Sequence, residues 1–173
     1  MMRTVTIFTA LLVTSLTLYG GFLPDLFGKE QNLTADRVLI VKSKRKLYLL
    51  KKNKIIAEYH IALGSEPVGK KSREGDRRTP EGNYTLDFRK KNSDFYRAIH
   101  ISYPNRADRL RAKKEGVKPG GAIMIHGQPN GWGWLSVILQ RFDWTAGCIA
   151  LSNGDMDEIW QRVKNKTPIE IRK

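Results

Sequence analysis

Short segments of alternating or wholly apolar residues follow one another from Arg37 onward, and they constrain the fold more than any other feature of the chain. Residues 38–41 and 46–51 are mostly apolar runs, and in residues 55–63 Ile55, Ala57, Tyr59, Ile61 and Leu63 share one face while Glu58 and His60 lie on the other. Lys52-Asn53-Lys54, between the last two segments, is typical of a hairpin turn. Since a period of two gives a strand one buried face, the pattern predicts a series of short β-strands.

The rest of the chain extends the β pattern and adds little helix. Further strands are predicted over residues 84–88, 98–103, 122–126 and 168–171. A helix with an apolar stripe is predicted after Ser152 or Asn153, a short one between residues 128 and 144, and at most an exposed helix or loop over 107–115. Residues 64–80 are polar, basic and rich in glycine, so they indicate a long loop. The sequence thus predicts one mainly β domain over residues 36–173, with one or two short helices.

The N-terminal residues 1–24 have the form of a targeting segment. Arg3 precedes an uncharged, mostly apolar stretch over residues 5–19, as in a secretory signal. No clear cleavage site of small residues follows, and residues 20–23 extend the run to the ~20 residues that span a bilayer. A removed signal peptide and an uncleaved signal anchor both remain open. Either one predicts an exported domain, in the periplasm or cell envelope, with membrane contact through this segment.

The chain is strongly basic, with a formal net charge of +14 among 173 residues. Nucleic acid is the usual partner of so basic a chain, but an exported protein meets anionic lipids and carboxylate-rich wall peptides instead. The cations are spread through several segments and are typical of a solvated face. We therefore expect no nucleic-acid partner, and the charge alone does not identify another.

The chain holds a single cysteine, Cys148, in the segment Thr145-Ala146-Gly147-Cys148. It cannot form a disulfide within the chain, so it is either a small buried apolar residue or a reactive thiol. A thiol attacks only as its thiolate, which a nearby base can generate. His126 ends a predicted strand and precedes Gly127, which favours a Cys-His acyl-transfer site in which the histidine holds the thiolate and later protonates a leaving amine.

Glycines beside both residues would let a substrate carbonyl approach the backbone. The N–H groups of Gly147 and Cys148 are the expected oxyanion donors, and we expect Gly127 and Thr145 to help bind substrate. The other two histidines fit different roles, His60 at the surface and His100 as a structural residue. One cysteine and three scattered histidines match no metal-ligand spacing, so neither a metal nor another cofactor is expected.

Several segments taken in order resemble the L,D-transpeptidase catalytic domain (YkuD type) of bacterial cell-wall enzymes. They are residues 38–50, 63–64 and 101–105, Gly75-Asp76-Arg77-Arg78-Thr79-Pro80-Glu81-Gly82-Asn83-Tyr84, Gly120-Gly121-Ala122-Ile123-Met124-Ile125-His126-Gly127 and Thr145-Ala146-Gly147-Cys148-Ile149. The resemblance implies a mixed β-sandwich with a Cys-His site at the rim of one sheet. It also implies that Cys148 is the nucleophile and His126 its base, oriented by a backbone carbonyl.

The reaction that this resemblance implies acts on peptidoglycan stem peptides. The thiolate attacks a stem tetrapeptide, expels the terminal D-alanine and forms a thioester, which the side-chain amine of a neighbouring stem or water then resolves. Some relatives attach or release a wall-anchored lipoprotein instead. Ala150 occupies a position where the family often has arginine or asparagine, so the donor carboxylate needs another partner, for which Asn153 or a nearby cation is a candidate.

Three hypotheses follow. The first is an L,D-transpeptidase. The second uses the same site as an L,D-carboxypeptidase or a lipoprotein-releasing hydrolase. The third, from another class, is a non-catalytic basic module that binds the wall surface.

Overall fold

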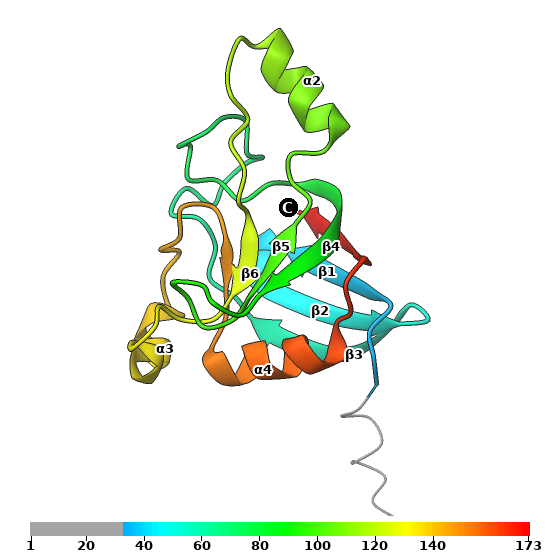
Figure 1. Cartoon of the computed structure of the whole chain (residues 1–173), viewed down its shortest axis with the longest axis vertical. Coiled ribbons are helices and arrows are strands. Elements are labelled where there is room, and N and C mark those ends of the chain that lie inside the picture. Colours follow the sequence, from blue (N-terminus) through cyan, green and yellow to red (C-terminus); the bar gives the residue numbers. More distant parts are fainter. Residues whose placement is uncertain (1–32) are drawn as a thin grey trace, which may run out of the picture.

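A single curled sheet of eight strands forms the body of the domain, in the order β3-β2-β1-β8-β4-β5-β6-β7 (Figure 1). This computed structural model describes residues 33–173, so the targeting segment expected over residues 1–24 lies outside the described residues. The strands are β1 Arg37–Val41, β2 Lys46–Lys51, β3 Lys54–His60, β4 Gly82–Lys90, β5 Ala98–Ile101, β6 Met124–His126, β7 Ile149–Ala150 and β8 Thr167–Arg172. The mainly β class predicted from the sequence is confirmed.

Local pairing follows the sequence pattern closely. Strands β2 and β3 pair antiparallel around a turn in which Lys52 and Asn53 both take positive φ, 48° and 63°. Positive φ at both central positions is the geometry of the tight turns that match strand twist. The C-terminal strand β8 lies between β1, to which it is parallel, and β4, to which it is antiparallel. This strand therefore joins the N-terminal hairpin to the half of the sheet that carries Cys148 and His126.

Three short α-helices accompany the sheet in the described part of the chain, one more than the sequence indicates: α2 Arg106–Lys114, α3 Ser136–Leu139 and α4 Asn153–Arg162. Ser152 caps α4 by accepting from the Asp155 N–H at 3.1 Å, and Asn105 forms a capping box with Asp108 at the start of α2. Helix α2 projects from the body at one end of the molecule, and α4 lies across the opposite end (Figure 1). Between residues 33 and 173 no helix is both long and apolar enough to span a bilayer.

Candidate active site

Strand pairing brings the ends of the segments that carry His126 and Cys148 close together at one edge of the sheet. Strands β6 and β7 are parallel, with Ile125 opposite Ile149 and both side chains fully buried in the core. Because side chains alternate along a strand, the residues flanking these isoleucines point to the other face. His126 follows one isoleucine and Cys148 precedes the other. From ordinary strand spacing and rise, their Cα atoms are about 8 Å apart, within reach of the two side chains.

The thiol of Cys148 is only partly buried and contacts the end of the neighbouring segment. Its Sγ lies 3.7 Å from the Ala122 carbonyl oxygen. Ala122 itself has a φ of 54°, which L side chains rarely adopt and which often marks functional sites. Burial raises the pKa of the thiol, although the Met124 N–H and the charge of Lys71 both act to lower it. The resting sulfur is therefore a neutral thiol at neutral pH.

His126 is almost fully buried, with 2% of its surface exposed. Its Nδ1 lies 2.7 Å from the Gly127 carbonyl oxygen, which can only accept, so Nδ1 carries the proton and Nε2 presents a lone pair. The ring packs against Phe95, with centroids 4.1 Å apart, and against the edge of Trp144 at 5.9 Å. Burial lowers the pKa of His126 to about 4, despite the opposing effect of the Gly127 contact.

Thr145 closes the turn that presents the thiol. Its Oγ1 donates to the Cys148 carbonyl oxygen at 2.8 Å and accepts from the Gly147 N–H at 3.0 Å. The expected oxyanion role of Gly147 must therefore be revised, because its N–H group is already satisfied within the protein. The Cys148 N–H is left as the candidate donor, and Thr145 shapes the turn with a side chain only 4% exposed.

The space beside Gly127 is filled by the protein and not by open cleft. An added Cβ atom would lie 2.7 Å from Asn153 Oδ1 and 2.8 Å from the Tyr96 carbonyl oxygen. Asn153 Oδ1 also accepts from the Gln128 N–H at 2.9 Å, so it supports the segment that follows His126. Gly127 thus permits close packing here, in contrast to the substrate-binding role expected from the sequence.

The other two histidines lie away from this face. His60 is exposed and its Nε2 contacts the Gln140 carbonyl oxygen at 2.8 Å. His100 stacks on Phe88, with centroids 4.4 Å apart, and its Nδ1 lies 2.7 Å from Asp87 Oδ1. Among the residues from 33 to 173, no group of histidine, cysteine and acidic side chains has the arrangement of a metal site.

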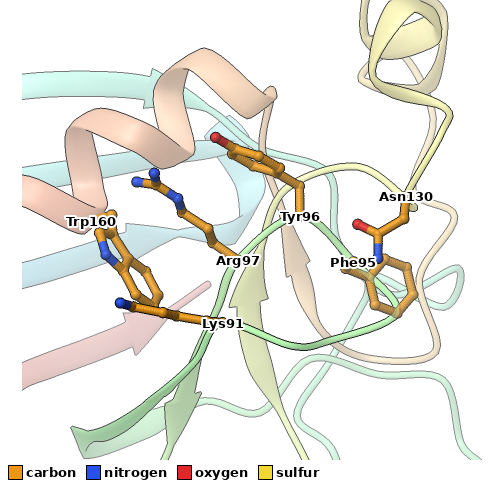
Figure 2. A pocket seen from close by; sticks show the side chains of 6 residues that line it. All are labelled: Lys91, Phe95, Tyr96, Arg97, Asn130 and Trp160. Atoms are coloured by element: carbon orange, nitrogen blue, oxygen red, sulfur yellow. The ribbon is translucent and has the colours of Figure 1, made fainter.

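A pocket of about 370 Å³ lies on the other side of Phe95. Aromatic and basic side chains line it (Figure 2), namely Lys91, Phe95, Tyr96, Arg97, Asn130 and Trp160. The Arg97 guanidinium lies 5.5 Å from the centroid of the Trp160 ring and pairs with Asp157 at 2.8 Å. Phe95 therefore contacts both this pocket and the His126 ring. Sequence reasoning missed it, because Phe95 and Trp160 are far apart in the chain.

Replacing Thr145 by valine is expected to lower the free energy of unfolding by about 2 kcal/mol, because the buried Gly147 N–H then loses its acceptor. Thr145→Ser keeps the hydroxyl and serves as the control, with a smaller loss. Urea denaturation of both variants measures the difference. Equal stabilities for the valine and serine variants would show that the hydroxyl does not hold this turn.

Comparison with known proteins finds similar sequences and similar structures. YafK of Escherichia coli (strain K12) is 33% identical over 111 residues, which are 63% of this chain and 37% of that protein. The helical cell shape determining protein Pgp2 from Campylobacter jejuni has a TM-score of 0.63 and 29% identity over 79% of this chain and 47% of that one. Bd1075 from Bdellovibrio bacteriovorus has a TM-score of 0.54 and 28% identity over 78% and 46% of the two chains.

More distant structures share the fold alone. The L,D-transpeptidase from Xylanimonas cellulosilytica has a TM-score of 0.51 at 14% identity, over 81% of this chain and 61% of that one. The present chain spans less than half the length of YafK, Pgp2 and Bd1075. Residues 35–171 match the L,D-transpeptidase catalytic domain profile, and the chain therefore belongs to this family.

Proposed function

We propose that this domain is a cysteine acyltransferase of the bacterial cell wall, an L,D-transpeptidase that acts on peptidoglycan stem peptides through a thioester on Cys148. One observation carries the proposal. Two parallel strands bring the segments that carry a partly exposed thiol and a buried imidazole close together at the edge of the sheet, in a chain of this family. Such a pair suits acyl transfer between peptides.

The protonation states of the pair define how the first step proceeds. Because the pKa of His126 is lowered and that of Cys148 is raised, both groups are neutral before substrate binds. The sulfur therefore loses its proton to His126 Nε2 while it attacks the donor carbonyl carbon, and the carbonyl electrons move to oxygen. The Cys148 N–H is positioned to donate to that oxygen. This concerted transfer replaces the preformed thiolate expected from the sequence.

The second half of the reaction returns the proton. As the tetrahedral intermediate collapses, its oxygen regains the double bond and the peptide C–N bond breaks. The imidazolium protonates the departing D-alanine amine, which leaves a thioester on Cys148. An amine from a neighbouring stem then attacks the thioester carbonyl carbon and gives a proton to His126. As the C–S bond breaks, the imidazolium returns that proton to the sulfur, which restores the thiol and leaves a new peptide bond.

The surroundings of the site suit an acidic peptide bound to a sugar. Lys91 and Arg97 place positive charge in the pocket beside Phe95, and the Trp160 ring provides a flat apolar face. The expected N-terminal targeting segment would carry the domain to the periplasm or cell envelope, where this substrate occurs. Ala150 is fully buried, so it presents no group to a donor carboxylate.

Product analysis with a defined muropeptide tests the proposal. The full-length chain is incubated with a disaccharide-tetrapeptide, and the products and the protein are examined by mass spectrometry. Cross-linked dimers, free D-alanine and an acyl adduct on Cys148 are expected, and Cys148→Ala should give none of them. Tripeptide without dimer would instead establish a hydrolase that uses the same site. No turnover, with a thiol that also resists alkylation, would support a non-catalytic wall-binding module.

A further inference from the structure

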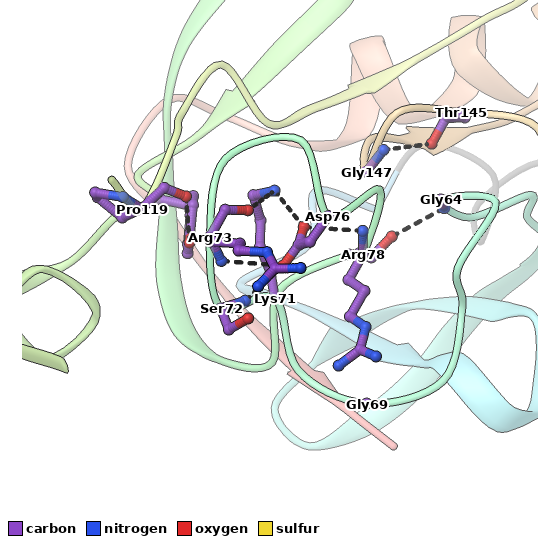
Figure 3. A network of polar contacts seen from close by, with 12 residues as sticks. Gly64, Gly69, Lys71, Ser72, Arg73, Asp76, Arg78, Pro119, Thr145 and Gly147 are labelled. Carbon is purple, nitrogen blue, oxygen red and sulfur yellow. Dashed lines mark hydrogen bonds and ion pairs between the residues drawn. The ribbon is translucent and has the colours of Figure 1, made fainter. Parts of the chain in front are cut away.

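Lys71 is a buried lysine in the long loop between β3 and β4. Only 3% of its surface is exposed, which is uncommon for a lysine unless its charge is paired. Its Nζ donates to Asp76 Oδ1 at 2.7 Å and to the Arg73 carbonyl oxygen at 3.1 Å (Figure 3). The ammonium is therefore fixed in one position and little shielded by water.

Asp76 holds this part of the loop together. Its two oxygens accept from the backbone N–H groups of Ser72 at 2.7 Å, Arg73 at 3.1 Å and Arg78 at 3.1 Å. Burial alone would raise the pKa of this carboxyl group, but Lys71 and the three N–H groups outweigh it and hold the pKa at about 2. Asp76 is thus a carboxylate across the working pH range.

The loop contacts both segments that hold the thiol. The Arg78 carbonyl oxygen would lie 2.8 Å from a Cβ atom on Gly147, the residue before the cysteine. On the other side, the Cα atom of Glu74 would lie 3.1 Å from a Cβ atom on Gly120, two residues before the carbonyl that contacts Sγ. The Glu74 N–H also donates to the Lys118 carbonyl oxygen at 2.8 Å. These backbone contacts hold the loop that carries Lys71 against the segments on both sides of the sulfur.

Few charges act on the sulfur from the elements around it. His126 is neutral on the strand side, and the Arg78 side chain extends away toward Gly69, 3.3 Å from a Cβ atom placed there. From the loop, Glu74 is exposed, and the Asp76 carboxylate, bonded to Lys71, opposes the effect of the lysine charge on the sulfur. Within the described part of the chain, Lys71 is the charged group whose field at Cys148 favours the thiolate. Its effect opposes the burial that favours the neutral thiol.

We propose that Lys71 is an electrostatic positioning residue for Cys148: its buried ammonium, held by Asp76 against the turn that carries the thiol, stabilises the negative charge that develops on sulfur. In the reaction proposed above, on which this role in catalysis rests, the lysine assists His126 by lowering the cost of separating the proton from the sulfur. It also accounts for how a pair of neutral groups begins the reaction.

A structural role for the ion pair is the alternative, and the two roles make opposite predictions. If the pair only holds the loop, removing either partner should alter the thiol in the same way. If Lys71 acts by its charge, removing it should disfavour the thiolate, whereas removing the Asp76 charge should favour it or leave it unchanged. The two single variants therefore separate charge from scaffolding.

The experiment measures the rate of Cys148 alkylation by iodoacetamide between pH 6 and pH 11 in the full-length chain. Lys71→Gln keeps a donor toward Asp76 and removes the charge, and Lys71→Met removes both. Asp76→Asn removes the opposing charge. Lys42→Gln is the matched control, because Lys42 is equally buried at 2% exposure and binds the same loop through the Gly69 and Thr79 carbonyl oxygens. Thermal unfolding confirms that each variant is folded.

The midpoint of the alkylation profile is expected to rise by about half a unit to one unit in Lys71→Gln, so that the thiolate fraction below the midpoint falls about three- to tenfold. The midpoint is a better measure than the rate at one pH, since a thiolate of higher pKa is intrinsically more nucleophilic. Lys42→Gln should match the wild type, and Asp76→Asn should shift the midpoint down or leave it unchanged. Because alkylation needs no muropeptide, this result is independent of whether the transpeptidase assay succeeds.

A wild-type midpoint in folded Lys71→Gln and Lys71→Met would overturn the proposal. So would an equal upward shift in Asp76→Asn, or in Lys42→Gln, since each would assign the effect to loosening of the loop.

Discussion

His126→Gln is expected to lower the rate of thioester formation at pH 7 by at least about a hundredfold, and also to remove a large part of the acid sensitivity of the fold. The kinetic loss follows from the removal of the base that accepts the sulfur proton, since a positioned acid-base group contributes about 10²–10⁴-fold. Glutamine can still donate to the Gly127 carbonyl oxygen, so the local packing is retained. Acyl-enzyme formation followed by mass spectrometry measures the loss.

The effect on stability comes from the same buried imidazole. Its pKa is about 4 in the folded protein, against 6.5 for the unperturbed group. Between these values the unfolded chain binds a proton on this residue and the folded chain does not, so acid favours unfolding. The contribution of the neutral His126 to the free energy of unfolding is complete above pH 6.5. It is lost as the pH falls through about 4, by about 3 kcal/mol in total.

Urea denaturation of the wild type and of His126→Gln at pH 7, 5 and 4 checks this prediction. The wild type's advantage in the free energy of unfolding should become smaller or change sign as the pH falls, because only the wild type carries the buried imidazole. His60→Gln, at an exposed position, should keep the wild-type pH dependence. If the free energy of unfolding fell equally with pH in the wild type and in His126→Gln, the burial of a neutral imidazole at this position would be contradicted.

The strands could be predicted from the sequence because each depends on the pattern of apolar residues that are neighbours in the chain. The Lys52-Asn53 turn and the strand after it involve neighbours in the chain, and the structure confirms both. The predicted alternation fails at its first residue, because a register shift in the pairing with β2 leaves Ile55 exposed and packs Ile56 on the core. The placement of β8 between β1 and β4 could not be predicted, because it pairs residues far apart in the chain, such as Val38 with Ile169 and Tyr84 with Ile169, and any apolar strand would satisfy the pattern. The start of helix α2 is indicated by the sequence, since Asn105 and Asp108 have the spacing of a capping box.

In the candidate site, too, the features set by neighbouring residues could be predicted and those set by distant contacts could not. Cys148 and His126 stand in short motifs, so local sequence was enough to select them. The neighbouring glycines suggested open space for a substrate, but the structure fills that space at Gly127 with Asn153 and Tyr96. Lys71 was indistinguishable from the other cations among 31 lysines and arginines, because its burial depends on how the whole loop folds around Asp76.

Gly64→Ala is expected to be the most damaging single substitution to the frame of the site, with a loss of at least about 3 kcal/mol in the free energy of unfolding. An added Cβ atom would lie 2.0 Å from the Arg77 carbonyl oxygen and 3.0 Å from the Gly147 Cα atom. Both neighbours are backbone atoms, so no side-chain rotation relieves the contact. Gly64 cannot move aside easily, because its N–H donates to Thr79 Oγ1 at 3.1 Å.

Gly64→Ala should also change the reactivity of the Cys148 thiol. Relief of the contact requires the backbone at Arg77 to move away from Gly64, and that movement shifts the adjoining Arg78, whose carbonyl oxygen packs against Gly147. We therefore expect slower Cys148 alkylation at pH 7 together with a fall in melting temperature of roughly 10 °C, from about 2–4 °C per kcal/mol in a domain of this size.

Gly154→Ala is the matched control, because this glycine lies in α4 with no atom within 4 Å of an added Cβ atom. Alanine there should stabilise the helix by up to about 1 kcal/mol and leave the thiol unchanged. A Gly64→Ala protein that melts with the wild type would mean that the loop does not pack against the cysteine turn. That result would contradict the mechanical link between the buried ion pair and the nucleophile, but it would not affect the parallel pairing of β6 and β7.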